Sequence, residues 1–352
     1  MNLTSIPGNE KCADCCEPDP KYSAYNLGIL ICENCAAIHK TLGPHISKVK
    51  SLNLENWDDN TLNSLRSLGN TKVNSKYEEN VPLFYKRPLP SDPQVVKEQW
   101  IRAKYERKEF FGDKKLSYAA GYKEGYLWKK GKDDKHFQKR RFILDTTENT
   151  LKYFRKEEDR DPKGCLRLDG INMMILPKKI GHPNAMQILY EQNEQTRNLF
   201  IYADDGQELI EWYTAVRAAK LNRLKIAYPN VDVVNLSTKI MWEYIKEGWL
   251  SKTGPRSGDA FRRRWVTLDS KKLTYYEDPF CPYPKGEVFI GSQGFEVEKK
   301  LINSGASNSK EVKDPNMAFI VKVPERCFQF LAETVEDADD WVEKIRTVII
   351  SN

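Results

Sequence analysis

The sequence lacks any apolar run approaching the roughly 18 to 20 residues that a membrane-spanning helix needs, which argues against an integral membrane protein. The opening stretch MNLTSIPGNE lacks the basic start and apolar core of a secretory signal peptide, so we expect the chain to stay in the cytosol or nucleus. Asn2 stands where N-myristoylation needs glycine, and the C-terminal IISN carries no cysteine for prenylation. We therefore expect any membrane contact to be made by folded surface.

No loop of the G-x-x-x-x-G-K-[ST] type is present either, which excludes a P-loop nucleotide site in the chain itself. Forty per cent apolar and 30 per cent charged residues describe a soluble globular protein rather than a disordered or fibrous one. A chain of 352 residues is long for one hydrophobic core, so two or three domains are expected. The net charge of +6 is modest for this length, so basic residues matter only where they gather.

The eight cysteines are expected to be thiols or metal ligands, because disulfides are rare in a reducing compartment. Cys12, Cys15, Cys32 and Cys35 form C-x2-C-x16-C-x2-C, in which each short pair can direct two thiolates at one ion. Two pairs complete a tetrahedral shell with no position for water, which predicts a structural zinc site. Four unligated thiols, or a ligand set that includes His39 or His45, are the alternatives. The cysteines outside this pattern, of which the last three are expected to fill core space, are Cys16, Cys165, Cys281 and Cys327.

A four-cysteine cluster is not itself a function, since nucleic-acid readers, ubiquitin-ligase modules and protein-binding ribbons all use one. Between the pairs lies the strand-like run YNLGILIC, and helical patterns follow around LNSLRSLGN. The stretch KCADCCEPDPKYSAYNLGILICENCAAIHKTLG, continued by ISKVKSLNLENW, resembles the zinc-finger catalytic domain of Arf GTPase-activating proteins over roughly residues 5 to 115. The resemblance implies that this region engages an Arf-type GTPase and promotes GTP hydrolysis in the partner's active site.

In the family, four residues separate the last cysteine from an arginine, and Lys40 stands at that position here. The family's arginine acts as a finger whose planar guanidinium touches phosphate oxygens in two places, and such fingers can be worth about 10³ to 10⁵ in rate. Lysine offers the charge without the fork. Lys40 is therefore a working finger, a silenced one, or an ordinary solvated lysine, and another arginine such as Arg66 could take its place. Tyr22 stands where the family has a tryptophan, which suggests local repacking.

The rest of the sequence contains a repeat. KEGYLWKKG at 123–131 recurs as KEGWLSKTG at 246–254, and FQKRRFIL at 137–144 recurs as FRRRWVTL at 261–268. These offsets of 123 and 124 residues mean that one domain type occurs twice after the cysteine region. In both copies apolar and polar residues alternate, which is the period of half-buried antiparallel strands.

Each copy ends with one amphipathic helix, whose apolar residues recur at spacings of three and four and so form a stripe that faces a core. The stripes consist of Leu209, Trp212, Tyr213 and Val216 in the first copy, and of Ala338, Trp341, Val342, Ile345, Val348 and Ile349 in the second. Antiparallel strands with a basic first hairpin and a closing helix that carries a tryptophan resemble the pleckstrin homology (PH) domain.

Taken together, the patterns predict a multidomain α+β chain. An N-terminal four-cysteine zinc-finger ArfGAP domain is followed by two PH domains, each a seven-stranded β-barrel or sandwich with a C-terminal helix. We expect the ArfGAP domain with a linker helix at 1–121, the first PH domain at 122–222, a connector at 223–244 and the second PH domain at 245–352. This order resembles the Arf GAP family with dual PH domains, the α-centaurins. Within these domains, we expect the linker helix at 97–110 and a loop between Gly291 and Pro315.

The first hairpin of the first PH domain is strongly basic. Residues 129–141, KKGKDDKHFQKRR, carry seven Lys or Arg against two Asp. Because side chains alternate along a strand, Lys139 and Arg141 share one face while Arg140 points to the other. If the hairpin pairs as PH hairpins do, we expect Lys129, Lys139 and Arg141 to converge on a pocket for a multiply phosphorylated headgroup.

The PH resemblance adds Tyr153 and Lys163 to this lipid-binding set. The second copy retains such residues at what we take as the corresponding places, Lys252, Arg262, Arg264, Tyr275 and Lys285, although its loop is less basic. A solvated strand face that binds no lipid tightly is the alternative for either copy. By family analogy the basic residues favour a 3-phosphorylated trisphosphate headgroup, that of phosphatidylinositol trisphosphate, and two modest sites could reinforce each other at a membrane.

The leading hypothesis is a cytosolic regulator that phosphoinositides recruit to the plasma membrane, where it activates an Arf-family GTPase without being an enzyme itself. The second hypothesis is a non-catalytic, lipid-binding adaptor whose finger Lys40 has silenced. A nucleic-acid binder would need basic and aromatic residues around the cysteines. The first 121 residues hold 17 Lys or Arg against 15 Asp or Glu, so we expect no nucleic-acid partner.

Overall fold

The computed structural model describes residues 3–131, 136–193, 195–254, 259–299 and 314–351. Contacts divide the chain into two compact units, one formed by residues 1–187 with 200–241 and the other by residues 188–199 with 242–352. A bilayer-spanning length of apolar residues is found in none of the described helices.

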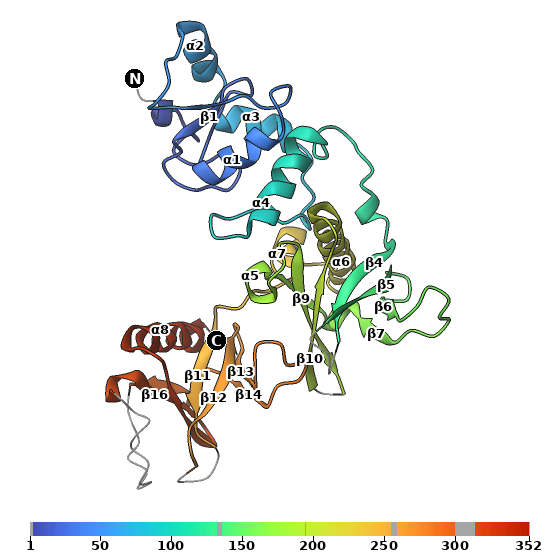
Figure 1. The fold of residues 1–352 in the computed structure, drawn as a ribbon, viewed down its shortest axis with the longest axis vertical. Helices are drawn as coiled ribbons and strands as arrows, with labels where there is room; N and C mark the ends of the chain where they lie inside the picture. Colours follow the sequence, from blue (N-terminus) through green and yellow to red (C-terminus); the bar gives the residue numbers. More distant parts are fainter. Residues whose placement is uncertain (1–2, 132–135, 194, 255–258, 300–313, 352) are drawn as a thin grey trace. The chain divides into compact units, whose positions relative to one another are not determined.

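The N-terminal domain is built on a small antiparallel sheet in the order β2-β1-β3 (Figure 1). Strand β2 is buried along its whole length because the run ILI is apolar on both faces. Helix α2 begins after Asp58, whose carboxylate accepts a hydrogen bond from the backbone N–H of Thr61. The elements are η1 (Leu3–Ser5), β1 (Tyr22–Ala24), β2 (Ile29–Ile31), α1 (Glu33–Thr41), β3 (Val49–Ser51), α2 (Asp59–Ser67), α3 (Gly69–Tyr77) and α4 (Gln94–Ile101).

The helix that we expected at 97–110 as a charged linker is instead part of the core of this domain. Helix α4 ends at Ile101 and continues as the π-helix η2 (Arg102–Glu106). Trp100 and Tyr105 are buried, and the ring of Trp100 packs against that of Phe110 with centroids 5.2 Å apart. The charged residues suggested an exposed helix, but several of them pair with acidic partners inside the domain.

Both PH domains have the predicted architecture, a seven-stranded sheet followed by a C-terminal helix. The first sheet has the order β7-β6-β5-β4-β10-β9-β8 and the second the order β14-β13-β12-β11-β17-β16-β15. The first consists of β4 (Tyr122–Lys130), β5 (Phe137–Asp145), β6 (Thr150–Phe154), β7 (Gly164–Arg167), β8 (Asn172–Ile175), β9 (Ala185–Gln192) and β10 (Gln195–Tyr202). The second consists of β11 (Lys246–Lys252), β12 (Arg262–Leu268), β13 (Lys272–Tyr276), β14 (Gly286–Phe289), β15 (Glu296–Glu298), β16 (Ala318–Val323) and β17 (Arg326–Leu331).

The closing helices, α6 (Gly206–Ala227) and α8 (Val335–Ser351), lie beside the strands of their own sheets (Figure 1). Their predicted apolar stripes are confirmed, since every stripe residue is buried except Ile349, which is half-buried against the same core. An ion pair holds the start of each sheet to its helix. Lys123 pairs with Glu211 at 2.9 Å, and Lys246 pairs with Asp337 at 2.8 Å. The shorter helical segments are η3 (Ser117–Ala119), η4 (Leu168–Gly170), α5 (Pro177–Ile180), α7 (Val233–Ser237) and η5 (Pro315–Met317).

Two connecting segments contain regular secondary structure. Helix α6 runs on to Ala227, so the predicted connector at 223–244 begins inside a helix, and its Ile240 is fully buried with Leu221 and Leu236. The predicted loop between Gly291 and Pro315 contains strand β15, which pairs with β16. Residues 300–313 of that loop lie outside the described part of the chain.

Candidate functional site

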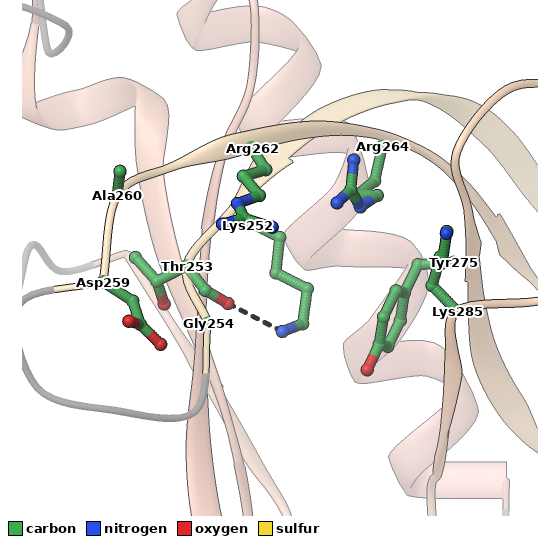
Figure 2. A pocket seen from close by; sticks show the side chains of 9 residues that line it. All are labelled: Lys252, Thr253, Gly254, Asp259, Ala260, Arg262, Arg264, Tyr275 and Lys285. Carbon is green, nitrogen blue, oxygen red and sulfur yellow. Dashed lines mark hydrogen bonds between the residues drawn. The ribbon is translucent and has the colours of Figure 1, made fainter.

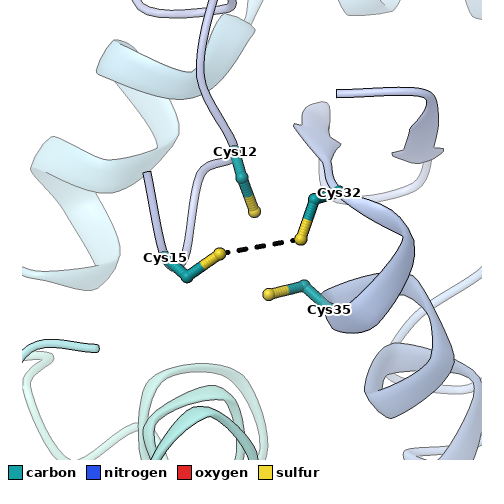
Figure 3. A group of neighbouring side chains, drawn as sticks. All are labelled: Cys12, Cys15, Cys32 and Cys35. Carbon is teal, nitrogen blue, oxygen red and sulfur yellow. Dashed lines mark hydrogen bonds between the residues drawn. The ribbon is translucent and has the colours of Figure 1, made fainter. Parts of the chain in front are cut away.

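The four cysteines of the predicted metal site lie together in the N-terminal domain (Figure 3). Cys12 and Cys15 come from the loop before β1, Cys32 follows β2 and Cys35 lies in α1. All four are buried, and their Sγ atoms lie within 4.8 Å of one another. A tetrahedral ion with metal–sulfur bonds of about 2.3 Å needs sulfurs about 3.8 Å apart, and the Sγ atoms of Cys15 and Cys32 are 3.6 Å apart. The arrangement is one that binds a metal ion.

Histidine does not join this ligand set. The imidazole of His39 is fully buried, with Nε2 3.0 Å from Asp14 Oδ2 and Nδ1 2.8 Å from Ser47 Oγ. Both ring nitrogens are therefore engaged elsewhere, and His45 is exposed beside Gly43. The scattered cysteines are not core residues as expected, because Cys165 and Cys327 are exposed and Cys281 is half-buried.

A buried ionic network includes Asp14, which lies between Cys12 and Cys15 in the sequence. Lys104 is fully buried, and its Nζ lies 3.1 Å from Asp14 Oδ1 and 2.8 Å from Glu78 Oε1. The hydroxyl of Tyr105 donates to Asp14 at 3.0 Å. Burial would raise the pKa of Asp14, but the charge of Lys104 and the hydrogen bond of His39 prevail and lower that pKa to about 2. The carboxylate therefore stays ionised and ties η2 to the cysteine loop and to α1.

Lys40 lies in the last turn of α1, immediately after the anchored His39. Its side chain is exposed, and Nζ lies 5.6 Å from the ring centroid of Tyr22 on β1. The backbone that carries Lys40 is thus held by buried groups while its ammonium stays available to a partner. Arg66 lies on a different helix, α2, and donates to Asn63 at 2.6 Å.

The second PH domain has a pocket of about 380 Å³ at the open end of its first hairpin. All five residues predicted for this domain line it, and Figure 2 shows the ring of Tyr275 across the pocket from Lys252. In the ladder Lys252 pairs with Arg262 and Leu250 with Arg264, so both arginines share the face that holds the buried Leu250. The lining also includes Thr253, Gly254, Asp259 and Ala260.

Each copy has a Lys-Gly pair that packs against a tyrosine of the neighbouring strand. The backbone N–H of Lys285 donates to Tyr275 O at 2.8 Å, and that of Lys163 donates to Tyr153 O at 2.8 Å. A Cβ on Gly286 would lie 2.1 Å from the Tyr275 hydroxyl oxygen. The missing side chain therefore lets the tyrosine ring lie across the glycine, beside the lysine. Gly164, in the first copy, lies against the ring of Tyr153 in the same way.

In the first PH domain the prediction that Lys129, Lys139 and Arg141 converge on one pocket is wrong. Lys129 pairs with Gln138, so Gln138 and Arg140 share its face, while Lys139 and Arg141 lie on the opposite face. Lys139 there forms an ion pair with Asp204 at 2.9 Å. Arg141 donates to Glu157 O at 2.6 Å and stacks on Phe154 with 4.5 Å from Cζ to the ring centroid.

Arg140 is the residue that the sequence interpretation missed. It occupies the place of Arg264, and each donates from Nη1 to the carbonyl of the preceding residue, at 3.3 Å and 2.9 Å. Lys129 and Lys252 also correspond, since each donates to the carbonyl of the next residue, at 3.1 Å and 2.8 Å. The 124-residue offset between FQKRRFIL and FRRRWVTL relates Arg264 to Arg140 directly, so the signal was present in the repeat.

The pKa values of Lys129 and Lys252 are both lowered. Burial lowers the pKa of Lys129 to about 8, aided by the charges of Arg140 and Lys163. Burial likewise lowers the pKa of Lys252 to about 8, where Arg326 and Arg264 add to the effect and Asp259 opposes it. A polyanion would favour the charged form of both lysines.

Anion binding is therefore expected to weaken as the pH rises. Above about pH 8 each free lysine must take up a proton to bind a phosphate, which costs up to roughly tenfold in affinity per pH unit and pocket. A single phosphate monoester loses its last proton with a pKa of about 6, and raising the pH can only add negative charge to an inositol phosphate, so the ligand does not cause the weakening. Calorimetric titration of a soluble inositol polyphosphate at pH 7, 8 and 9 measures the effect. The double variant Lys129→Arg and Lys252→Arg should flatten the profile, and equal affinity of the natural chain at pH 7 and 9 would contradict it.

Comparison with known proteins gives matches along nearly the whole chain. The family model described as "Putative GTPase activating protein for Arf" matches residues 1–114, and the PH domain model matches residues 121–221 and 244–349. The chain is similar to "Arf-GAP with dual PH domain-containing protein 2" of Rattus norvegicus, with 42% identity over 98% of this chain and 91% of that protein. The protein of the same name from Homo sapiens is 39% identical over 98% of this chain and 90% of its own length.

Solved structures match single domains. The ArfGap domain of HIV-1 Rev binding protein aligns with 32% of this chain and 83% of its own, at 22% identity and a TM-score of 0.29. The C-terminal PH domain of pleckstrin in complex with D-myo-Ins(1,2,3,4,5)P5 aligns with 28% of this chain and 95% of its own, at 27% identity and a TM-score of 0.24.

Proposed function

The chain belongs to the Arf GTPase-activating proteins with dual PH domains, and from this premise we propose that it is a phosphoinositide-recruited activator of GTP hydrolysis by an Arf-family GTPase. The position of Lys40 carries the proposal, because an exposed cation follows a buried histidine on a helix that also holds a metal ligand. Lys40 would place this cation in the active site of the partner GTPase. As a compact point donor, an ammonium can neutralise charge that develops on one phosphate oxygen at a time.

Zinc is the metal we propose for the four cysteines. Four thiolates at tetrahedral spacing suit Zn²⁺, and the closed shell leaves no position for water, so the ion would organise the fold and take no part in catalysis. Its bonds to Cys32 and Cys35 would hold the start of α1, and the buried His39 fixes the end of that helix. The helix would then present Lys40 from a rigid base.

Both PH pockets are proposed to bind phosphoinositide headgroups. The second offers Lys252, Arg262, Arg264 and Lys285 around one cavity, and the first offers Lys129, Arg140 and Lys163 at matching places. Several cations around one site favour a multiply phosphorylated ligand, and we propose phosphatidylinositol trisphosphate. Binding would recruit the chain from the cytoplasm to the plasma membrane.

A specific feature favours a second candidate function. Lys40 lacks the planar fork of the family's arginine, so the domain could hold the GTPase without speeding hydrolysis. The chain would then be a membrane adaptor. The two functions differ only in the chemistry at Lys40 and share the lipid pockets.

Single-turnover GTP hydrolysis separates the two functions. We expect the natural chain to stimulate an Arf-family GTPase on liposomes that contain phosphatidylinositol trisphosphate. Lys40→Ala should abolish the stimulation because the cation is lost, and Lys40→Arg should increase it by roughly tenfold or more because the fork is restored. Lys72→Ala changes an exposed lysine on α3 and is the matched control, expected to leave the rate unchanged.

A second arm tests recruitment. Replacing Arg140 and Arg264 by Ala should remove the stimulation on liposomes without affecting that of a soluble, truncated GTPase. Stimulation only by Lys40→Arg, with liposome binding intact, would establish the adaptor. Stimulation that persists in Lys40→Ala would remove Lys40 from the proposal altogether.

A further inference from the structure

The end of the β9–β10 hairpin packs inside the second compact unit, although its strands belong to the sheet of the first PH domain. The backbone N–H of Asn198 donates to Pro282 O at 2.9 Å, and its side-chain amide donates to Cys281 O at 3.1 Å. Beside it, the guanidinium of Arg197 stacks on the ring of Tyr283, with 4.9 Å from Cζ to the centroid. Asn198 is buried, with 6% of its surface exposed.

The loop that receives these contacts leads directly to Lys285, a lining residue of the second lipid pocket. It connects β13 to β14 and spans residues 277–284, directly between the pocket residues Tyr275 and Lys285. Lys285 donates from its backbone to Tyr275 O at 2.8 Å, and its Nζ pairs with Glu277 at 2.8 Å. The position of Lys285 therefore depends on how this loop is held.

The two repeats differ at both partners of this contact. The second repeat has the largely apolar loop EDPFCPYPK at 277–285, where the first has the charged RKEEDRDPK at 155–163. At the hairpin, the 129-residue offset that relates Trp212 to Trp341 aligns the buried Asn198 with the exposed Cys327. Each change suits a contact in which only the hairpin of the first repeat and only the loop of the second take part.

We propose that Asn198 is a positioning residue for the second phosphoinositide pocket. Its hydrogen bonds to the carbonyls of Cys281 and Pro282 hold the loop that precedes Lys285 and so set where Lys285 meets a phosphate group. The pocket is therefore complete only when the hairpin of the first repeat is present. The inference rests on the proposed lipid-binding function of this pocket. The proposal means that a residue of the first repeat supports the second pocket, although all the residues that line this pocket belong to the second repeat.

Binding of inositol 1,3,4,5-tetrakisphosphate to the full chain tests the proposal. The parent carries Lys129→Ala and Arg140→Ala, so that only the second pocket contributes to calorimetry. On this parent, Lys285→Ala should weaken binding by roughly tenfold or more, and Asn198→Ala by about three- to tenfold. The two changes together should weaken binding no more than Lys285→Ala alone, because Asn198 acts through Lys285. Cys327→Ala, the equivalent position in the second repeat, is the matched control and should bind like the parent.

The outcomes distinguish this proposal from the one on which it rests. No loss in Lys285→Ala would overturn the lipid-binding function of the pocket, and the role of Asn198 with it. A loss in Lys285→Ala with none in Asn198→Ala, or losses that multiply in the combined variant, would overturn the role of Asn198 alone.

Hydrogen exchange separates positioning from general misfolding. In Asn198→Ala the amides of residues 277–285 should exchange faster, while those of β11 and α8 stay as protected as in the parent. Accelerated exchange throughout the second sheet would mean that Asn198 only stabilises the fold, which would also overturn the proposal.

Discussion

Stripping the metal from the four-cysteine site is expected to unfold the N-terminal domain and to leave both PH domains folded. The three strands of that domain have only three residues each, and the ligands come from the loop before β1, from the residue after β2 and from α1. Four thiolates bound to one zinc ion contribute roughly 10 to 16 kcal/mol in small zinc domains, more than such a sheet can replace. Hydrogen exchange resolved by segment, before and after treatment with a chelator, measures the loss.

The variant Cys35→Ser should reproduce this loss without a chelator, because it leaves three thiolates. Cys165→Ser is its matched control, since Cys165 is exposed on β7 and lies far along the chain from the site. Unchanged protection of α1 and β1–β3 in the metal-free protein would contradict the prediction. Metal release together with lost protection in the PH sheets would show that the domains do not unfold separately.

Lys104→Met is expected to destabilise the N-terminal domain by about 3 to 5 kcal/mol, the typical result of removing one partner of a buried ion pair. Asp14 and Glu78 would keep their carboxylates without a counter-charge, and the carbonyl of Ala13, which accepts from Lys104 at 3.1 Å, would lose a donor. Hydrogen exchange of α1 and β1–β3, with the metal bound, measures the change in the free energy of opening of this domain.

Lys97→Met provides the matched control. Lys97 is also buried and lies seven residues earlier on the same continuous helix, but its Nζ donates to the carbonyl of Pro90 at 2.5 Å. Replacing it should cost only about 1 to 2 kcal/mol, because a carbonyl loses a donor and no buried acid loses its charge partner. Equal losses in the two variants would show that the ion pairs of Lys104 add nothing beyond its hydrogen bonds.

The features that could be predicted from the sequence are those that local spacing decides. The two C-x2-C pairs predicted the cluster because short spacings already direct thiolates at one point. The helix stripes around Trp212 and Trp341 predicted the buried faces because a helix repeats every 3.6 residues wherever it occurs. The repeat predicted two like domains, and in the second one all five expected residues line the pocket.

Other features depend on partners distant in the sequence. Lys104 looked like part of an exposed, charged linker, yet its partners Asp14 and Glu78 lie 90 and 26 positions away along the chain. The contact of Asn198 with Cys281 spans 83 positions. A sequence pattern can indicate which apolar residues are buried. It cannot show that a charged residue is buried beside its counter-charge after folding.

The sequence by itself therefore determined the four-cysteine cluster, the repeat and the residue types gathered at each hairpin. The tertiary structure decided which of the hairpin residues share a face. The first hairpin makes this plain. Its basic residues are consecutive, and successive side chains of a strand point to opposite faces, so a shift of one position exchanges the whole set. The pairing of Lys129 with Gln138 places Arg140 beside it and turns Lys139 and Arg141 away. That register depends on packing Leu127 and Phe142 into the core, which only the folded chain provides.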